Sequence, residues 1–121
     1  MSPAPFEVES EQREDGIRAV TVRGELDMNT APELEAELDR IPLDGATAVM
    51  LDLSACEFID STGIALIVRA WQRLDGEGKG RFVLCCINHQ VRRLLKITGV
   101  ESSISMHEQR EDALAELQTP V

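Results

Sequence analysis

Residues 60–63, Asp-Ser-Thr-Gly, place a carboxylate, two hydroxyls and a glycine directly before an apolar run with helical spacing. Asp60 or Ser61 could serve as the N-cap of that helix, and Gly63 would allow close packing. A hydroxyl at a helix start has a second property, because free backbone N–H groups and the helix dipole stabilise an anion bonded to it. The pattern therefore makes Ser61 a candidate phosphorylation site.

Nearby carboxylates would oppose a phosphate at this position. Asp27 stands three residues before Thr30, where a lone aspartate is usually a turn residue that binds nearby N–H groups. The functional alternative is that its charge helps a partner enzyme to orient the Ser61 hydroxyl. Because a phosphoserine carries about −1.5 to −2 charges, Asp27 and Asp60 would also repel it. The balance predicts a switch, in which the fold tolerates the phosphate and the phosphate changes what the surface binds.

Catalytic and metal-binding patterns are absent from the sequence. His89 and His107 stand alone, with no Cys, Asp or Glu at metal-ligand spacing. Neither a Gly-x-Ser-x-Gly motif nor a phosphate-binding glycine loop occurs. Gly76, Gly78 and Gly80 follow a helical pattern and precede a strand pattern, which is the reverse of a dinucleotide-binding motif. We therefore expect no enzyme activity, no metal and no cofactor.

The apolar spacing predicts the elements that must position these residues. Strands with alternating or continuous apolar residues are expected at 6–9, 17–22, 46–53, 81–87 and 103–107. Helices with apolar residues three and four apart are expected at 31–41, 62–74, 89–97 and 111–117. Thr30 offers a hydroxyl cap to the first helix, with Pro32 in its first turn, and Gly99 ends the third helix.

The order of these elements is typical of an α/β domain. Helices that alternate with strands give a mainly parallel sheet with right-handed crossovers, and the opening hairpin adds an antiparallel N-terminal edge strand. Functional groups in such sheets gather where strands end and helices begin. Three loops are expected at that end of the sheet: residues 24–29 after the second strand, 54–63 after the third and 88–89 after the fourth.

The chain has 121 residues, 43% of them hydrophobic, which suits one domain with an aliphatic core. Its 22 Asp+Glu against 12 Lys+Arg give a formal charge of −10, which would repel nucleic acid and anionic membranes. No apolar run approaches the roughly 20 residues that a membrane span needs, and the N-terminal residues are acidic rather than signal-like. We expect a cytoplasmic protein with free thiols at Cys56, Cys85 and Cys86.

A response-regulator receiver shares this size and this alternation of strands and helices. Its chemistry needs an acidic pair after the first strand, an acceptor aspartate at the end of the third and a lysine near the end of the last parallel strand. Neither Lys79 nor Lys96 lies in that strand, which disfavours the receiver. A small flavodoxin-like enzyme would need a deep apolar pocket with convergent polar groups, for which the sequence offers no catalytic set.

Three motifs stand in register with the expected elements. They are Val-Arg-Gly-Glu-Leu-Asp at 22–27, Leu-Asp-Leu at 51–53 running to Phe-Ile-Asp-Ser-Thr-Gly-Ile at 58–64, and Ile-Asn at 87–88 with the helix end Leu-Leu-Lys-Ile-Thr-Gly-Val at 94–100. Together they resemble the anti-sigma factor antagonists, bacterial members of the STAS domain family. The match runs from about residue 6 to residue 117, which implies one STAS domain over residues 1–121 with its core at about 6–117.

This resemblance implies that Ser61 is phosphorylated by a cognate anti-sigma factor that is also a serine/threonine kinase. The unphosphorylated form would bind this kinase and release a sigma factor, and a phosphatase would restore binding after phosphorylation. Thr62 replaces a second serine found in many relatives and is the alternative acceptor, although Ser61 aligns with the family acceptor. The expected surroundings of the phosphosite and partner surface are Asp27, Asn29, Thr30, Asp60, Thr62, Gly63 and Asn88.

A constitutive STAS scaffold, as a subunit of a transporter or of a sensory complex, is the alternative function. There Ser61 would act only as a helix cap. The sequence shows no fused sensor or membrane segment, which favours a free switch. We expect the free chain to be monomeric and to act by changing partners rather than by catalysis.

Overall fold

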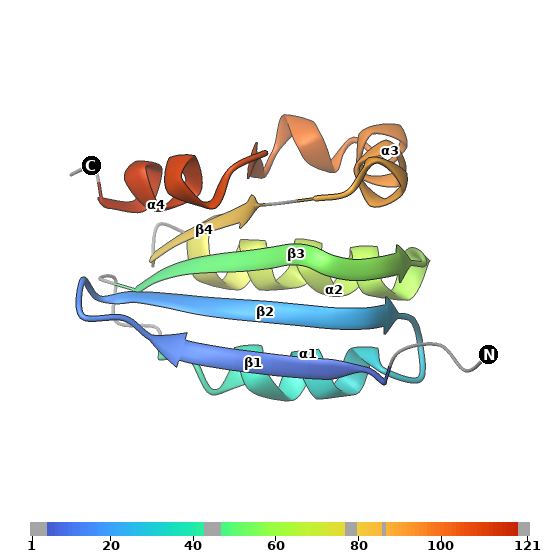
Figure 1. The fold of residues 1–121 in the computed structure, drawn as a ribbon, viewed down its shortest axis with the longest axis horizontal. Helices are drawn as coiled ribbons and strands as arrows, with labels where there is room; N and C mark the ends of the chain where they lie inside the picture. The colour runs from blue at the N-terminus through green and yellow to red at the C-terminus, as the bar shows by residue number, and fades with distance from the viewer. Residues whose placement is uncertain (1–4, 43–46, 77–79, 86, 119–121) are drawn as a thin grey trace.

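The computed structural model describes residues 5–42, 47–76, 80–85 and 87–118. Its strands form one sheet in the order β1-β2-β3-β4-β5, with β1 antiparallel to β2 and the other neighbours parallel (Figure 1). The strands are β1 (Glu7–Gln12), β2 (Ile17–Leu26), β3 (Thr47–Ile59), β4 (Gly80–Cys85) and β5 (Ser105–His107). The predicted α/β class with an antiparallel N-terminal edge strand is confirmed.

Four α-helices occur within the described ranges, as the sequence predicts. They are α1 (Ala31–Asp39), α2 (Ser61–Trp71), α3 (His89–Ile97) and α4 (Arg110–Gln118). A π-helical segment, Gln72–Gly76, continues α2, and a 3₁₀ turn, Val100–Ser102, follows α3. Within the described residues no helix is long and apolar enough to cross a membrane.

The main core lies on the face of the sheet that α1 and α2 cover, and these helices lie behind the sheet in Figure 1. Because successive strand residues point to opposite faces, Val20 and Val22 of β2 both enter this core. The opposite face carries a smaller cluster beneath α4, formed by Ile17, Ala19, Met50, Val83, Cys85, Ala113 and Leu117. Residues 49–53 of β3 contribute to both faces, which explains why this strand is almost continuously apolar.

An ion pair between a buried aspartate and a partly exposed arginine fixes α4 to the sheet. Asp52 of β3 is the only charged residue that is buried among the described residues, and its Oδ2 atom accepts a hydrogen bond from Nη1 of Arg110 at 2.8 Å. Its Oδ1 atom accepts from the Ser54 N–H at 2.9 Å. A buried carboxylate is costly unless it is paired and hydrogen-bonded, so these contacts specify where α4 begins.

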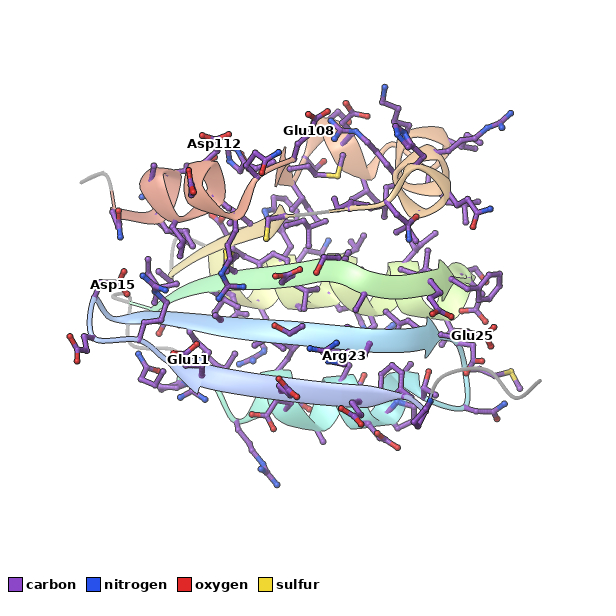
Figure 2. All side chains as sticks on the ribbon, in the orientation of Figure 1. Glu11, Asp15, Arg23, Glu25, Glu108 and Asp112 are labelled. Atoms are coloured by element: carbon purple, nitrogen blue, oxygen red, sulfur yellow. The ribbon has the colours of Figure 1, made fainter. Side chains whose placement is uncertain are left out.

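Among the described strands, β1 lies at the edge of the sheet and pairs only with β2. Glu7, Glu9 and Glu11 alternate along this strand, so their side chains share one face. Glu9 lies 4.0 Å from Nε of Arg23 on β2. Figure 2 shows Arg23 and Glu25 along β2, on the part of the sheet that α4 leaves uncovered.

Two predicted loops are in part strands. β2 continues to Leu26 and β3 to Ile59, so the expectation that residues 24–26 and 54–59 lie in loops is wrong. The β2–β3 ladder survives here through register shifts between Thr21 and Arg23 and between Gly24 and Glu25. At both shifts the extra residue is in β3, and Gly24, paired with Cys56 beside the second shift, has φ +91°, a conformation that suits glycine. The shifts break the apolar alternation from which strands are recognised.

Cys56 and Cys85 are buried, and neither is in a disulfide, as predicted. Burial raises the pKa of the Cys56 thiol, whose Sγ atom donates to the Phe58 carbonyl at 3.3 Å. A protonated, buried thiol is a poor nucleophile, so Cys56 serves the core. The expectations for Gly78, Lys79 and Cys86 fall outside the described residues.

Candidate functional site

The N-terminus of α2 is capped by Asp60. Its Oδ1 atom accepts hydrogen bonds from the Thr62 N–H at 2.9 Å and the Gly63 N–H at 3.1 Å, and its backbone is extended. The Asp60 N–H donates to the Leu26 carbonyl at 3.2 Å, which ties the start of α2 to the end of β2. Of the two caps that the sequence left open, Asp60 takes this role.

Gly63 lies against the sheet, as predicted from its position. A Cβ atom placed on it would lie 2.8 Å from Cγ1 of Ile59 and 2.8 Å from Cγ of Leu26. Both neighbours are fully buried at the ends of β3 and β2. The missing side chain therefore lets the first turn of α2 press directly onto the strand ends.

Ser61 is the first residue of α2, and its side chain is exposed. Its hydroxyl has no hydrogen-bond partner in the part of the chain that the structure describes. Thr62 is half-buried, so the two hydroxyls differ in access. The arrangement leaves Ser61 free to react at a position where the helix dipole favours negative charge.

Asp27 organises the turn between β2 and α1. Its Oδ1 atom accepts from the Asn29 N–H at 2.9 Å and the Thr30 N–H at 3.1 Å, which confirms that it is a turn carboxylate. The prediction that the Thr30 hydroxyl caps α1 is wrong. That hydroxyl instead donates to the Glu25 carbonyl at 2.7 Å and accepts from the Asp27 N–H at 2.9 Å. In the first turn of α1, Pro32 has no N–H to offer, and the Glu33 N–H donates to the Thr30 carbonyl at 3.0 Å.

Asn88 connects the third predicted loop to the same end of the sheet. Its side-chain oxygen accepts from the Val91 N–H at 2.9 Å and caps α3, while Nδ2 donates to the Cys56 carbonyl of β3 at 2.6 Å. Asp60 makes the corresponding link to Leu26 of β2. The three regions that carry the predicted site residues therefore meet at the carboxyl ends of β2 and β3 (Figure 1).

Sequence reasoning missed two exposed apolar residues at this end. Met28 and Phe58 are 69% and 46% exposed, and Phe58 stands opposite Glu25 in the β2–β3 register. Glu57 is exposed beside it, and Figure 2 shows Glu25 at the end of β2. We call Glu25, Met28, Glu57, Phe58 and Ser61 the strand-end surface. The sequence held one signal for this surface. Phe58 follows the acidic residue Glu57, at a position that does not continue the alternation of core residues along β3.

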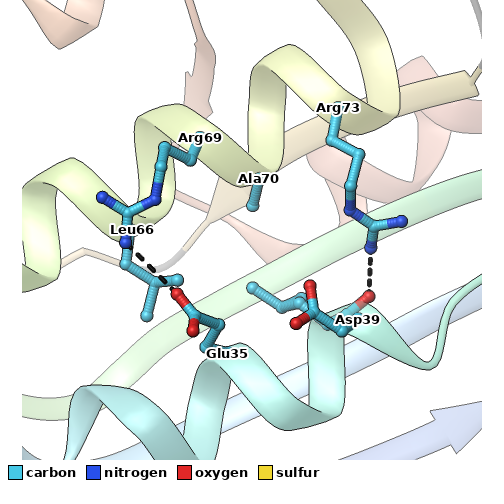
Figure 3. A pocket seen from close by; sticks show the side chains of 7 residues that line it. Glu35, Asp39, Leu66, Arg69, Ala70 and Arg73 are labelled. Carbon is cyan, nitrogen blue, oxygen red and sulfur yellow. Dashed lines mark hydrogen bonds and ion pairs between the residues drawn. The ribbon is translucent and has the colours of Figure 1, made fainter.

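A cavity of about 260 Å³ lies elsewhere, between α1 and α2 (Figure 3). Glu35, Arg69 and Arg73, which line it, form contacts within the fold. Nη2 of Arg69 lies 3.2 Å from Oε2 of Glu35, and the Arg73 guanidinium donates to the carbonyls of Leu38 and Ile41 at the end of α1. These contacts join α1 to α2. Within the described ranges no three His, Cys, Asp or Glu side chains converge to hold a metal ion.

The fold and the site define a small α/β domain whose candidate site is a surface, built around an exposed serine at a capped helix N-terminus. The STAS domain model matches residues 10–113 of the chain. The chain therefore belongs to the STAS domain family, and the resemblance found in the sequence is confirmed. The expected domain limits, residues 1–121 with a core at about 6–117, stay a prediction.

Named relatives agree with this assignment. The chain is 33% identical over 98 residues to the anti-sigma-B factor antagonist of Staphylococcus aureus (strain NCTC 8325 / PS 47), covering 81% of this chain and 90% of that protein. The crystal structure of an anti-sigma factor antagonist from Mycobacterium paratuberculosis has a TM-score of 0.81 at 28% identity, over 95% of this chain and 96% of that one. The phosphorylated form of SpoIIAA, a Bacillus cell fate determinant, shares the fold at a TM-score of 0.69 and 20% identity, over 91% and 98%.

Proposed function

We propose that this protein is an anti-sigma factor antagonist switched by phosphorylation of Ser61. The unphosphorylated form binds a cognate anti-sigma factor that is also a serine/threonine kinase, and the sigma factor is released. Phosphorylation ends that binding, and a phosphatase restores it. In this proposal the chain acts in the cytoplasm, supplies the acceptor hydroxyl and a docking surface, and catalyses nothing itself.

The exposed and unpartnered Ser61 hydroxyl carries this proposal. A structural serine at a helix start normally caps the helix, yet here Asp60 holds the N–H groups of Thr62 and Gly63. The Ser61 side chain is therefore left without a structural task among the described residues. The names of the relatives, which are anti-sigma factor antagonists, support the same assignment.

The proposed transfer uses ATP bound to the kinase. The Ser61 Oγ atom attacks the γ-phosphorus, the bond from that phosphorus to the bridging oxygen breaks, and ADP leaves. The hydroxyl proton passes to a base of the kinase. To restore the unphosphorylated form, the phosphatase directs the oxygen of a water molecule at the phosphorus, and the bond from phosphorus to the Ser61 Oγ atom breaks. A proton of that water passes to Oγ, which regenerates the hydroxyl, and inorganic phosphate leaves. In this proposal the charge of Asp27 helps the kinase to orient the Ser61 hydroxyl. Asp27 lies at the same end of the sheet, since it directly follows Leu26, whose carbonyl accepts the Asp60 N–H.

The phosphate switches binding through charge. It adds about −1.5 to −2 charges to a surface that already carries Glu25, Glu57 and Asp60. At physiological ionic strength charges interact over about 8 Å, so the effect is confined to this end of the molecule. Met28 and Phe58 provide the apolar anchors that a partner would cover, and a charge beside them opposes their desolvation.

The test is incubation with ATP and the kinase-type anti-sigma factor encoded in the same gene neighbourhood, followed by peptide mass spectrometry. We expect one phosphate on Ser61, none on a Ser61→Ala variant and an unchanged yield on Thr62→Val. Transfer to neither hydroxyl by a kinase shown to be active on another substrate would refute the proposal. Recovery of transporter or sensory subunits without any kinase in a pull-down would instead favour the constitutive scaffold.

A further inference from the structure

The exposed large hydrophobic residues of the described chain form two pairs. Met28 and Phe58 belong to the strand-end surface, whereas Leu94 and Ile97 lie on α3 and are 37% and 73% exposed. A single exposed apolar side chain is ordinary on a protein surface, but neighbouring ones on one helix face point to a contact.

The apolar pair on α3 is accompanied by free positive charge. Arg93 and Lys96 are exposed, and neither side chain forms an ion pair or hydrogen bond with another described residue. Each of the other described arginines does so, including Arg92 of the same helix, whose Nη1 atom lies 3.6 Å from Oε1 of Glu108. In a chain with a formal charge of −10, α3 is thus a local source of uncompensated positive charge.

Helical geometry places these four side chains together. Val91 and Leu95 are buried against the core, one turn apart. Arg93, Lys96 and Ile97 are three and four residues apart, so they share the opposite, outward side of the helix, and Leu94 borders it. We call Arg93, Leu94, Lys96 and Ile97 the α3 surface.

The two surfaces are complementary in kind. The strand-end surface joins two apolar side chains to the exposed carboxylates of Glu25 and Glu57. The α3 surface joins two apolar side chains to two cations. Neither Glu25 nor Glu57 forms an ion pair with another described residue. The carboxylates of the strand-end surface and the cations of the α3 surface are therefore both available to a second chain.

We propose that two copies of the chain form a reversible dimer, in which the α3 surface of each copy docks on the strand-end surface of the other. A two-fold axis makes both contacts at once and closes the assembly. The two surfaces lie at the same end of the fold, because Asn88 at the start of α3 bonds to the Cys56 carbonyl of β3 (Figure 1). The occupant is a second copy rather than a lipid surface, because a chain with charge −10 and two free cations is repelled by anionic lipids.

The dimer forms as concentration rises. Two chains of charge −10 repel each other at long range, which favours the monomer in dilute solution. At about 0.15 M ionic strength the repulsion is screened beyond about 8 Å, while the contacts within the interface persist. The proposal does not require phosphorylation of Ser61, but the dimer would cover the surface on which Ser61 lies.

Sedimentation equilibrium at about 0.15 M ionic strength tests the proposal with a charge exchange. One variant combines Arg93→Glu with Lys96→Glu, and the other combines Glu25→Lys with Glu57→Lys. Each alone sets like charges against each other, and we expect at least about tenfold weaker self-association. An equimolar mixture restores opposite charges at both contacts and should associate at least as well as the native chain.

Matched variants control for net charge. Arg40→Glu with Gln72→Glu and Gln109→Glu changes the charge as the first variant does, at exposed positions outside both surfaces. Glu14→Lys with Glu101→Lys matches the second variant at exposed positions. Neither control should weaken self-association as the paired charge reversals do. Circular dichroism verifies that every variant is folded.

Three results would overturn the proposal. The native chain could stay monomeric at millimolar concentration, or the exchanged pair could fail to associate when mixed. As a third result, the native chain could stay monomeric but float with phosphatidylserine vesicles, while the Arg93→Glu, Lys96→Glu variant does not float. That result would assign α3 to a lipid surface. Because no kinase or ATP is present, these outcomes leave the phosphorylation test unaffected.

Discussion

Replacing Gly63 with alanine tests whether close packing, rather than helix propensity, decides the residue at this position. In a free helix the exchange would stabilise by about 1 kcal/mol, because glycine is the poorer helix former. Here the new Cβ atom would lie 2.8 Å from Cγ1 of Ile59 and from Cγ of Leu26, and 3.1 Å from Cδ2 of Leu26. The two nearest are a mid-chain atom of Ile59 and the branch-point atom of Leu26, both in buried side chains, so these neighbours cannot swing away without moving the core.

Overpacking of this kind costs about 1–3 kcal/mol, which outweighs the gain in propensity. We therefore expect Gly63→Ala to lower the free energy of unfolding by about 1 kcal/mol, with a range of roughly 0–2. Urea titration measures it, and with a slope of about 1–3 kcal/mol/M the midpoint should fall by several tenths of a molar. The variant should also accept phosphate at Ser61 more slowly, because the start of α2 must move away from the strand ends.

Ala65 provides the matched control, because it is exposed in the same helix. Ala65→Gly should destabilise by about 1 kcal/mol through propensity alone. The difference between the two measurements isolates the effect of the contact with Leu26 and Ile59. A Gly63→Ala protein that is more stable than the native chain by the amount lost at Ala65 would refute the packing argument.

Three further predictions concern charge. Asp60→Ala should lower the free energy of unfolding by about 1 kcal/mol in urea titration, and Asp60→Asn, which keeps an acceptor, by much less; equal losses would contradict the capping role. Ser61→Asp should weaken binding of the kinase and Ser61→Ala should preserve it, so equal affinities by calorimetry would count against the charge mechanism. Hydrogen bonds from Arg13, which has the largest effect, and from Gln118 lower the pKa of Asp15 from 3.8 to about 2, so the stability they add is present above pH 3.8 and is lost as pH falls through about 2. In Arg13→Gln an NMR titration should show the Asp15 pKa nearer its ordinary value, and an unchanged value would exclude Arg13 as the cause.

The order of the elements could be predicted because the core is aliphatic and each strand or helix repeats its apolar residues at its own period. The ends of β2 and β3 could not, since their ladder passes two register shifts and a glycine with positive φ. Such shifts depend on how one strand is paired with another, which local periodicity does not contain.

At the candidate site the sequence located Ser61, Asp27, Asp60 and Gly63, because their types and order carry a motif. It misassigned Thr30, since either its hydroxyl or the Asp27 carboxylate could have served the turn, and only the geometry shows which does. Phe58 is exposed because α4 covers only part of its face of the sheet. How far that helix reaches depends on tertiary packing, which no single segment of the sequence encodes.

The free edge at β1 also bears on how this protein behaves when it is abundant. An uncovered strand offers unpaired N–H and C=O groups to any passing chain and can seed aggregation. Two copies aligned edge to edge would bring the rows formed by Glu7, Glu9 and Glu11 into proximity, and like charges at adjoining strands disfavour that pairing. Neutralising these glutamates should therefore lower the solubility of the folded protein and promote fibrillar association, even where its stability to urea is unchanged.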